Sequence, residues 1–559
     1  MTEQEKVESG NGKNTETPQY DHLEETSQYS ILKNIAGELE SHPAIIYKSR
    51  YISFHNLISS IDSLASYMSA MELVKGDRVA IFLDNSPQFV ISLYASMKIG
   101  VIAAPMDPEL SHIEIRNSIN SIGAKCIIIS DVGFIKISDL AKNGINVIVV
   151  RYQDFMSFEN GVVRSFENLG FIRHIPWSKN VVKFSDTLFE GSGEEAEIDL
   201  YRDTSILIQT PSVSGEQRFV KITQMNLQAA VQSFNGWFPA FEKPLKVAST
   251  VPFFSAYSTV LSIFFTFSRG WTAIIGDKLN IIRELSDFIL KNDPNLIIGN
   301  SFVVKLVSGI EKKIRIKRKK ISPRIIISSL GNTPWEMLQK IEEDLGFHII
   351  EGYSVPEASG LTHLNDYDRN NRRPGSVGKA LSMVRSEIVD EITGQPKQFM
   401  EDGQLTISGP QVTPGYWGLD QETRERIKDG NFLTMDIAHK DRDSYYYITG
   451  KLNDQIYSGG IMISPREIED VLTRIDTIAE AAVIGLPDKS GNEIIKAFLS
   501  PAEGKTISLD KVMKIVASNL SPNKIPREYV IRQELPKTLN GNIIRRILKE
   551  EELAKQKQL

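Results

Sequence analysis

The segment GKLNDQIYSGGIMISPREIE, residues 450–469, combines a turn, a glycine pair and the start of a helix. Ser464 suits the N-cap of that helix, Pro465 its first position and Glu467 its third, where a glutamate closes a capping box. The small polar residues after the opening glycine can absorb a large backbone change, which makes Asn453 a candidate hinge residue. An ordinary linker explains these residues equally well. In either case the segment marks a domain boundary.

Upstream of this boundary, from about residue 29 to 440, short apolar runs alternate with amphipathic segments, as in α/β layers. RVAIFLD at 78–84 predicts a buried strand, and Ser86, Pro87 and Gly100 predict the cap, first residue and end of the following helix. TVLSIFFTFS at 259–268 is too short to span a bilayer and suits a buried helix.

A second strand–helix–strand unit lies between RIIISS and HIIEGY. Thr333 is its predicted N-cap, Pro334 its first helical residue, Glu336 the capping-box partner and Gly346 its terminator. This unit brings the sequence GYSVPE to the end of a strand. Because open sheets bind ligands at strand ends, we expect a site there.

Residues after 450 change to a compact α+β pattern. The predicted fold class is therefore α/β, with a large multi-layer N-terminal domain over residues 29–450 and a small mobile α+β domain over 451–559. Residues 1–28 are rich in Glu, Thr, Asn, Gln and Ser and lack an apolar core, so we expect a disordered tail and no targeting signal.

Composition excludes several classes of function. A chain of 559 residues is too long for one core, and its net charge of −6 gives no footprint for nucleic acid. The single cysteine, Cys126, lies in the apolar run KCIIIS, which indicates a buried strand residue and fits a cytoplasmic protein without disulfides. The eight histidines show no metal-ligand spacing. The basic run EKKIRIKRKK at 311–320 has two explanations. It is either a solvated face, or a surface that makes a peripheral contact with a membrane or binds the phosphates of CoA.

Four further stretches precede the segment 450–469 in a fixed order: EGYSVPEAS (351–359), GSVGKAL (375–381), EDGQLTISGPQVTPGYWG (401–418) and DGNFLTMD (429–436). In order and spacing they resemble the AMP-forming acyl-CoA synthetase (adenylate-forming) superfamily, and in particular the fatty-acid–CoA ligases. The resemblance covers roughly residues 30–555. It implies that a carboxylate attacks the α-phosphate of ATP and expels pyrophosphate, and that CoA then displaces AMP after the small domain rotates. The implied cofactors are ATP, Mg²⁺ and CoA, and we expect a fatty acid or similar carboxylic acid as substrate.

The resemblance also implies a role for individual residues. Glu357 takes the magnesium position. The nucleotide-binding positions are Thr210, Ser212, Ser214, Gly215, Arg218, Gly331, Gly352, Tyr353, Ser354, Asp436 and Lys451. The CoA-binding positions are Ser458, Gly459 and Gly460. The acid pocket is expected at Phe254, Ser255 and Tyr257, with 328–332 and 351–354 also lining it.

Four residues are substituted relative to the family pattern, and one loop also carries an added negative charge. The phosphate loop, TPSVSGEQR at 210–218, contains Glu216 and ends in Arg218 where the family has lysine. Pro356 replaces a threonine, and Lys451 replaces an arginine, which keeps the charge but loses the bidentate fork. In PKTLNGNIIRR, Asn542 replaces the family's adenylation lysine.

The loss of this lysine bears most directly on the first step. A unit charge ~4 Å from an anion contributes about 4 kcal/mol at an effective dielectric of about 20. Its loss slows the step on the order of a thousandfold, and asparagine cannot neutralise charge. Lys537 and Arg545 are the nearby cations that could act with Asn542 instead. Three hypotheses follow: an active acyl-CoA synthetase, a catalytically silent relative that binds nucleotide or acyl-CoA, and an enzyme that processes preformed acyl-adenylate.

Overall fold

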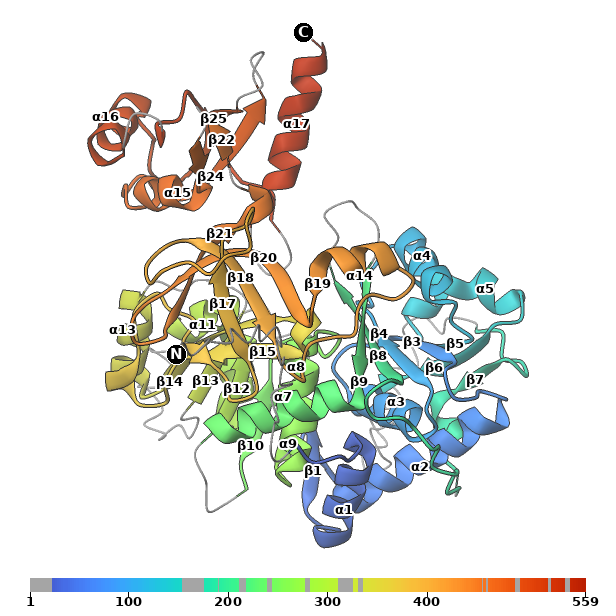
Figure 1. Cartoon of the computed structure of the whole chain (residues 1–559). Coiled ribbons are helices and arrows are strands. Elements are labelled where there is room, and N and C mark those ends of the chain that lie inside the picture. Colours follow the sequence, from blue (N-terminus) through green and yellow to red (C-terminus); the bar gives the residue numbers. More distant parts are fainter. Residues whose placement is uncertain are drawn as a thin grey trace, which may run out of the picture.

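The computed structural model describes residues 23–152, 175–189, 191–210, 218–238, 244–276, 282–309, 325–329, 335–454, 456–458, 461–487, 493–520, 524–537 and 543–558. Two large sheets and a smaller one form the N-terminal part, and a small lobe follows at the C-terminus (Figure 1). Within the described ranges, every helix is too short or too polar to cross a lipid bilayer.

The larger sheet has nine strands and carries most of the predicted site. Its order is β16 (Lys379–Ala380), β15 (Gly360–Leu364), β14 (His348–Val355), β13 (Ile325–Ser328), β12 (Leu296–Gly299), β10 (Lys246–Ser249), β11 (Thr272–Ile275), β1 (Pro43–Tyr47) and β2 (Arg50–Ser53). The strands from β14 to β1 are parallel, and the edge strands β2, β15 and β16 are antiparallel. Their near-continuous Ile, Val and Ala runs suit a sheet that is covered on both faces.

The second large sheet has seven strands, in the order β7 (Val181–Lys183), β6 (Asn146–Val150), β5 (Cys126–Ser130), β3 (Arg78–Phe82), β4 (Ile102–Pro105), β8 (Thr204–Thr210) and β9 (Arg218–Thr223). Cys126 is fully buried in β5, as its apolar neighbours predicted, and burial raises the pKa of its thiol to about 12. It is therefore a core residue rather than a nucleophile.

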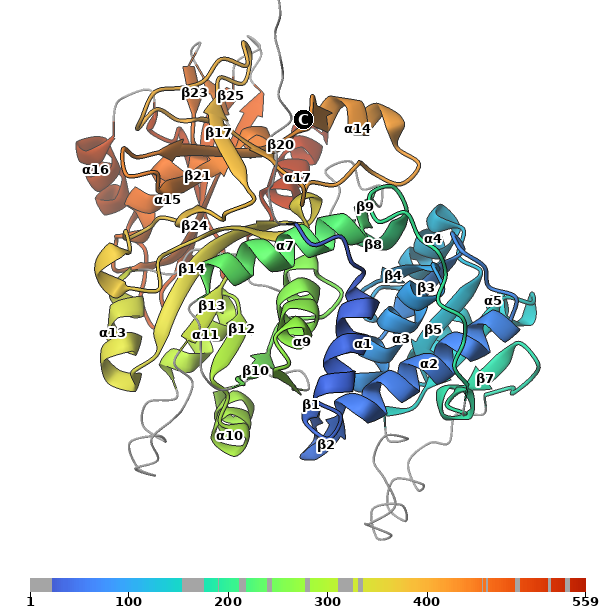
Figure 2. The ribbon, with the colours of Figure 1, turned by 60° about the horizontal axis from the view of Figure 1, so that its bottom comes forward.

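Helices cover the two sheets and join them. Helix α7 (Gln224–Trp237) runs across the junction and contacts β9 of one sheet and β15 of the other (Figure 2). The remaining helices of the large part are α1 (Gln28–Glu38), α2 (Phe54–Ala70), α3 (Pro87–Lys98), α4 (His112–Ile122), η1 (Gly133–Ile137), α5 (Ser138–Lys142), η3 (Phe184–Thr187), α8 (Ala256–Ser258), η4 (Thr259–Phe265), α9 (Thr266–Ser268), α10 (Ile282–Asn292), α11 (Ser301–Ser308), α13 (Trp335–Leu345), η5 (Pro356–Ala358), η6 (Arg369–Asn371) and α14 (Asp420–Arg426).

Several local predictions are confirmed. Ser86 accepts a hydrogen bond from Phe89 N as the cap of α3, and Pro87 opens the helix. Gly346 follows α13 with a φ of +71°, as a terminating glycine does, whereas Thr333 and Pro334 lie outside the described residues. The apolar stretch at 259–268 is a buried helix, whose first part, η4, has the rarer π geometry.

Ordered structure begins before the predicted limit of the tail. Ser27 caps α1, and Gln28 bonds two residues of α7 through its backbone N–H and its side-chain amide. The partners are the side-chain carbonyls of Gln224 and Gln228, at 3.0 and 2.8 Å. Residues 1–22 lie outside the described residues.

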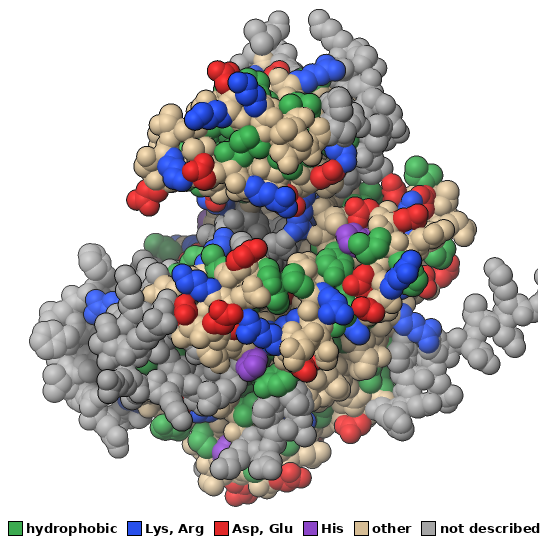
Figure 3. Space-filling view, turned by 90° about the vertical axis from the view of Figure 1, so that its left-hand side faces the viewer, with side chains coloured by type: hydrophobic (Ala, Val, Ile, Leu, Met, Phe, Trp, Pro, Cys, Tyr) green, Lys and Arg blue, Asp and Glu red, His purple; other side chains and the backbone are tan. Residues whose placement is uncertain are grey.

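A third, antiparallel sheet leads from the large part to the small lobe. It contains β17 (Arg385–Val389), β18 (Gly403–Ser408), β20 (Asn431–Lys440) and β19 (Ile427–Lys428), and β21 (Tyr446–Lys451) pairs with β20. The lobe contains η7 (Leu452–Asp454), β22 (Ile456–Ser458), β23 (Ile461–Ile463), α15 (Pro465–Thr473), β24 (Ile478–Pro487), β25 (Glu493–Pro501), α16 (Leu509–Asn519), β26 (Glu528–Ile531) and α17 (Arg545–Gln558). Figure 3 shows an indentation between lobe and large part on the face turned to the viewer.

The helix predicted at 464–474 is present, but the predicted capping box is wrong. Ser464 holds the N-cap position of α15 without a side-chain cap bond. Its hydroxyl instead donates to the carbonyl oxygen of Thr449 in β21, at 3.2 Å. Glu467 forms an ion pair with Lys524, at 2.6 Å. Tertiary contacts with β21 and with the loop before β26 therefore outcompete the local box.

Candidate active site

Glu357, the predicted magnesium position, lies just beyond the carboxyl end of β14, in η5. It is 7% exposed, and burial raises the pKa of its carboxyl group above the usual range. The hydroxyl of Tyr416 donates to its Oε1 at 2.9 Å, and its own backbone N–H also favours the ionised form. No described Lys, Arg or His lies within ion-pair distance of this carboxylate.

The loop after β18 holds Glu357 in place. Thr413 N donates to Glu357 O at 2.8 Å, and the side chain of Gln411 donates to Ala358 O at 2.9 Å. Ser359, in the left-handed region with a φ of +55°, donates to Gln411 O. Our interpretation of the sequence missed Tyr416 as a site residue. Its only signal was its position in GYWG, within a stretch that we used for fold matching alone.

The predicted nucleotide residues Tyr353 and Asp436 are brought together by two strands, β14 and β20. The hydroxyl of Tyr353 donates to Asp436 Oδ2 at 2.5 Å, and Lys451 Nζ contacts Oδ1 at 2.8 Å. Both carboxylate oxygens thus have partners from the chain. Burial, followed by the charge of Asp436, raises the pKa of Tyr353 well above its usual value, so this hydroxyl remains a donor.

Backbone spacing beside Tyr353 requires a glycine. A Cβ placed on Gly352 would lie 2.7 Å from His363 O and 2.9 Å from two leucine methyl groups. The neighbouring Ser354 shares a 2.8 Å hydrogen bond with Ser329, which follows β13. These two serines therefore lie at adjacent strand ends, where the sequence placed the site.

The ends of the phosphate loop are described, but its centre is not. Thr210 ends β8 and is buried. Arg218 begins β9, and its guanidinium pairs with Glu422 of α14 at 2.7 Å, a partner that the sequence did not suggest. Ser212, Ser214, Gly215, Glu216 and Gly331 lie outside the described residues.

The predicted acid-pocket residues lie where α8 begins. Ser255 caps α8, Phe254 is partly buried, and Tyr257 is 2% exposed. The Tyr257 hydroxyl donates to Ile327 O of β13 at 3.1 Å. Tyr257 therefore spans from α8 to the strand that leads to Ser329.

In the small lobe, the two cations considered as substitutes for the missing lysine are already paired. Lys537 contacts Glu480 at 2.7 Å. Arg545 contacts Glu469 at 2.6 Å and Asp454 at 3.0 Å. Asn542, Gly459 and Gly460 lie outside the described residues, Ser458 ends β22, and Asn453 is part of η7.

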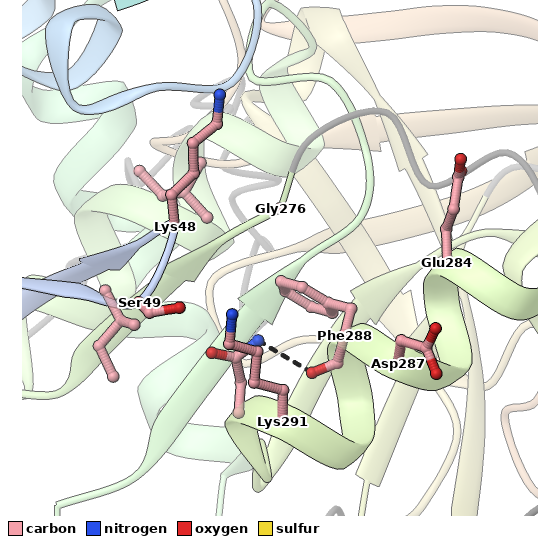
Figure 4. A pocket seen from close by; sticks show the side chains of 10 residues that line it. Lys48, Ser49, Gly276, Glu284, Asp287, Phe288 and Lys291 are labelled. Carbon is pink, nitrogen blue, oxygen red and sulfur yellow. Dashed lines mark hydrogen bonds between the residues drawn. The ribbon is translucent and has the colours of Figure 1, made fainter. Parts of the chain in front are cut away.

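A pocket of about 390 Å³ lies elsewhere, between the β1–β2 turn and α10. None of the predicted site residues lines it. Lys48 and Glu284 extend away from Phe288 on opposite sides rather than converging (Figure 4). Ligand sites need convergent polar groups, so this pocket does not compete with the strand-end site.

The donor set fits a magnesium ion that is held mainly by its substrate. Among the described residues, no three His, Cys, Asp or Glu side chains cluster as metal ligands. Mg²⁺ is commonly bound by one or two carboxylates together with substrate phosphates and waters. Glu357, buried and without a cationic partner among the described residues, can supply that one carboxylate.

The fold is that of the adenylate-forming enzymes, with a large N-terminal domain and a small C-terminal domain. The chain belongs to the AMP-binding enzyme family: that family's model matches residues 32–417, and the AMP-binding enzyme C-terminal domain matches 467–542. It is 29% identical over 532 residues to a long-chain-fatty-acid–CoA ligase of Bacillus subtilis, covering 94% of each chain. It is 26% identical to one of Yersinia pestis, covering 94% of this chain and 95% of the relative.

Solved structures support the same fold. ATP-bound MatB from Rhodopseudomonas palustris superposes with a TM-score of 0.81 at 21% identity, covering 94% of this chain and 99% of that one. The anthranilate CoA ligase AuaEII, in complex with anthranoyl-AMP, gives 0.79 at 19% identity, covering 94% and 97%. At these identities the likeness establishes the fold alone.

Proposed function

We propose that the protein is an ATP-dependent acyl-CoA synthetase that activates a fatty acid through an acyl-adenylate. The observation that carries this proposal is the buried carboxylate of Glu357, just beyond the end of β14, near the hydrogen-bonded pair that Tyr353 of β14 forms with Asp436 of β20. The choice of a fatty acid as substrate is supported by the names of the curated relatives and by the apolar surroundings of Tyr257.

The geometry suits the first half-reaction. A carboxylate oxygen of the acid forms a bond to the α-phosphorus of ATP while the bond to pyrophosphate breaks, so negative charge moves onto the leaving group. Magnesium, when bound, neutralises part of that charge. Glu357 would hold the ion, Asp436 would accept from the ribose, and Tyr353 would lie against the adenine. Water exclusion by the buried strand ends would strengthen each of these contacts.

An ATP–pyrophosphate exchange assay with a panel of acids tests this proposal. We expect exchange with fatty acids and faster exchange in the Asn542→Lys variant, because a lysine restores a cation. A matched Asn519→Lys variant, at an exposed position of α16, controls for added charge. If neither the wild type nor Asn542→Lys shows pyrophosphate exchange with any acid, the proposal is eliminated.

The paired state of the cations favours a second candidate, a relative that binds nucleotide without efficient adenylation. Arg218, Lys451, Lys537 and Arg545 each contact a carboxylate of the chain itself. Calorimetry separates the two candidates. Tight binding of ATP or acyl-CoA without turnover would support the binding-only candidate. Production of acyl-CoA would exclude it. Thioester formed only from supplied acyl-AMP and CoA would indicate an enzyme for preformed adenylate.

A further inference from the structure

Arg426, the last residue of α14, holds a cation in a fixed place beside the site. Its Nε donates to Leu433 O at 3.0 Å, and its Nη2 donates to Thr434 O at 3.3 Å. The guanidinium also lies over the ring of Phe432, 5.3 Å from its centroid. Both carbonyls belong to β20, immediately ahead of Asp436, so the side chain is anchored next to the predicted ribose contact.

The charge of Arg426 acts on Glu357, the predicted magnesium position. It lowers the pKa of Glu357 and of Tyr416, against the larger raising effect that burial has on both groups. Within the described ranges, no carboxylate lies within ion-pair distance of Arg426. Its Nη1 likewise has no hydrogen-bond acceptor among the described residues. The side chain therefore keeps a charge and two N–H donors for a further anion.

The absence of a carboxylate partner within the described ranges distinguishes Arg426 from the other cations considered for the site. Arg218, Lys451, Lys537 and Arg545 would each have to leave a carboxylate before they could neutralise a phosphate. Arg426 needs no such exchange. Helix α14 also carries Glu422, the partner of Arg218, so this one helix connects the end of the phosphate loop to the surroundings of Glu357.

We propose that Arg426 contacts the phosphate chain of ATP beside Glu357 and supplies, during adenylation, positive charge that Asn542 cannot supply. This inference rests on the proposed function. As the new phosphorus–oxygen bond forms and the bond to pyrophosphate breaks, charge accumulates on the leaving oxygens. Arg426 acts through its charge and its N–H donors and transfers no proton in this step. A fixed donor is worth most where charge develops, because it needs no reorganisation at that moment.

Binding of Mg²⁺·ATP and of adenosine to Arg426→Met tests the contact directly. Adenosine has the base and ribose but no phosphate. We expect ATP affinity to fall about tenfold to a hundredfold while adenosine affinity stays within about twofold, since adenosine has no phosphate for Arg426 to contact. Arg426→Lys keeps the charge and should lose less. Arg424→Met, on the exposed face of the same helix, is the matched control and should change neither affinity.

Pyrophosphate exchange then tests the role in catalysis. Arg426→Met should reduce exchange about a hundredfold. Adding Asn542→Lys should then increase exchange by a larger factor in the Arg426→Met background than in the wild type. Equal ATP affinity and exchange in Arg426→Met and Arg424→Met would overturn the proposal. Parallel loss of adenosine and ATP affinity would also overturn it, because that result indicates a structural role. If the wild type shows no exchange with any acid, the proposed function fails, but the comparison of ATP with adenosine still decides for or against Arg426.

Discussion

The hydroxyl of Tyr416 donates a 2.9 Å hydrogen bond to Glu357, a residue 59 positions earlier in the chain. This bond joins the loop after β18 to the end of β14 and orients the carboxylate that we assign to magnesium. Glu357 is buried, so a lost donor cannot be replaced by bulk water without opening the site. The pair therefore links the stability of the large domain to the geometry of the metal position.

Tyr416→Phe should weaken both properties. A hydrogen bond to a charged group contributes about 1.5 to 3 kcal/mol, and we expect a loss in this range in urea unfolding. Loss of a group that orients a metal ligand should raise the magnesium requirement of pyrophosphate exchange about tenfold to a hundredfold. Tyr201→Phe removes an exposed tyrosine–glutamate bond and serves as the control. An unchanged magnesium requirement in Tyr416→Phe would contradict the orienting role.

Glu357→Gln should abolish exchange and yet stabilise the protein at neutral pH. The pKa of Glu357 is raised in the folded state, so folding disfavours the ionised form. The stability that this group contributes is present below its unfolded pKa, about 4.5, and is lost as the pH rises through the folded pKa. We therefore expect the variant to be more stable by about 1 to 3 kcal/mol at pH 7.5, and the difference to shrink towards pH 4. Urea unfolding across this pH range measures it, and a variant less stable at pH 7.5 would contradict it.

Local patterns in the sequence were sufficient for the strands, for the cap of α3 and for the position of Glu357 just beyond the end of β14. Ser86 and Gly346 act as predicted because their roles depend on neighbouring residues in the chain. Ser464 did not close its box because a carbonyl of β21 competes for its hydroxyl. Such a competitor is set by tertiary packing and leaves no local signal.

The electrostatic partners could not be predicted for the same reason. Arg545 was a candidate for the missing cation, but its carboxylate partner Glu469 lies 76 residues upstream. Glu422 and Arg426 belonged to a stretch without a motif, and only the packing of α14 brings them to the site. Charge is visible in a sequence, whereas the distance between two charges depends on the fold.

Arg545→Met should destabilise the small lobe rather than act on chemistry alone. Glu469 has a 10% exposed side chain and also accepts from Val483 N of β24. Removing Arg545 leaves this carboxylate buried and unpaired, which costs about 3 to 5 kcal/mol. Hydrogen exchange of the β24 amides should accelerate accordingly, and Arg545→Met with Glu469→Gln should recover part of the loss. Unchanged exchange of β24 together with slower adenylation would instead assign Arg545 to the reaction.

Arg466→Met should loosen the connection between the small lobe and β21. Arg466 Nη1 donates to Ile448 O, next to the bond from Ser464 to Thr449 O. Each bond contributes about 1 kcal/mol, so losing one should raise the population with a detached lobe about fivefold. Limited proteolysis between residues 450 and 464 should then be about fivefold faster, whereas Arg474→Met, exposed at the far end of α15, should not change it. If the lobe must leave this contact for CoA to attack, Arg466→Met should also speed thioester formation from supplied acyl-AMP. Faster proteolysis without that gain would mean that the contact holds the lobe but does not control the second half-reaction.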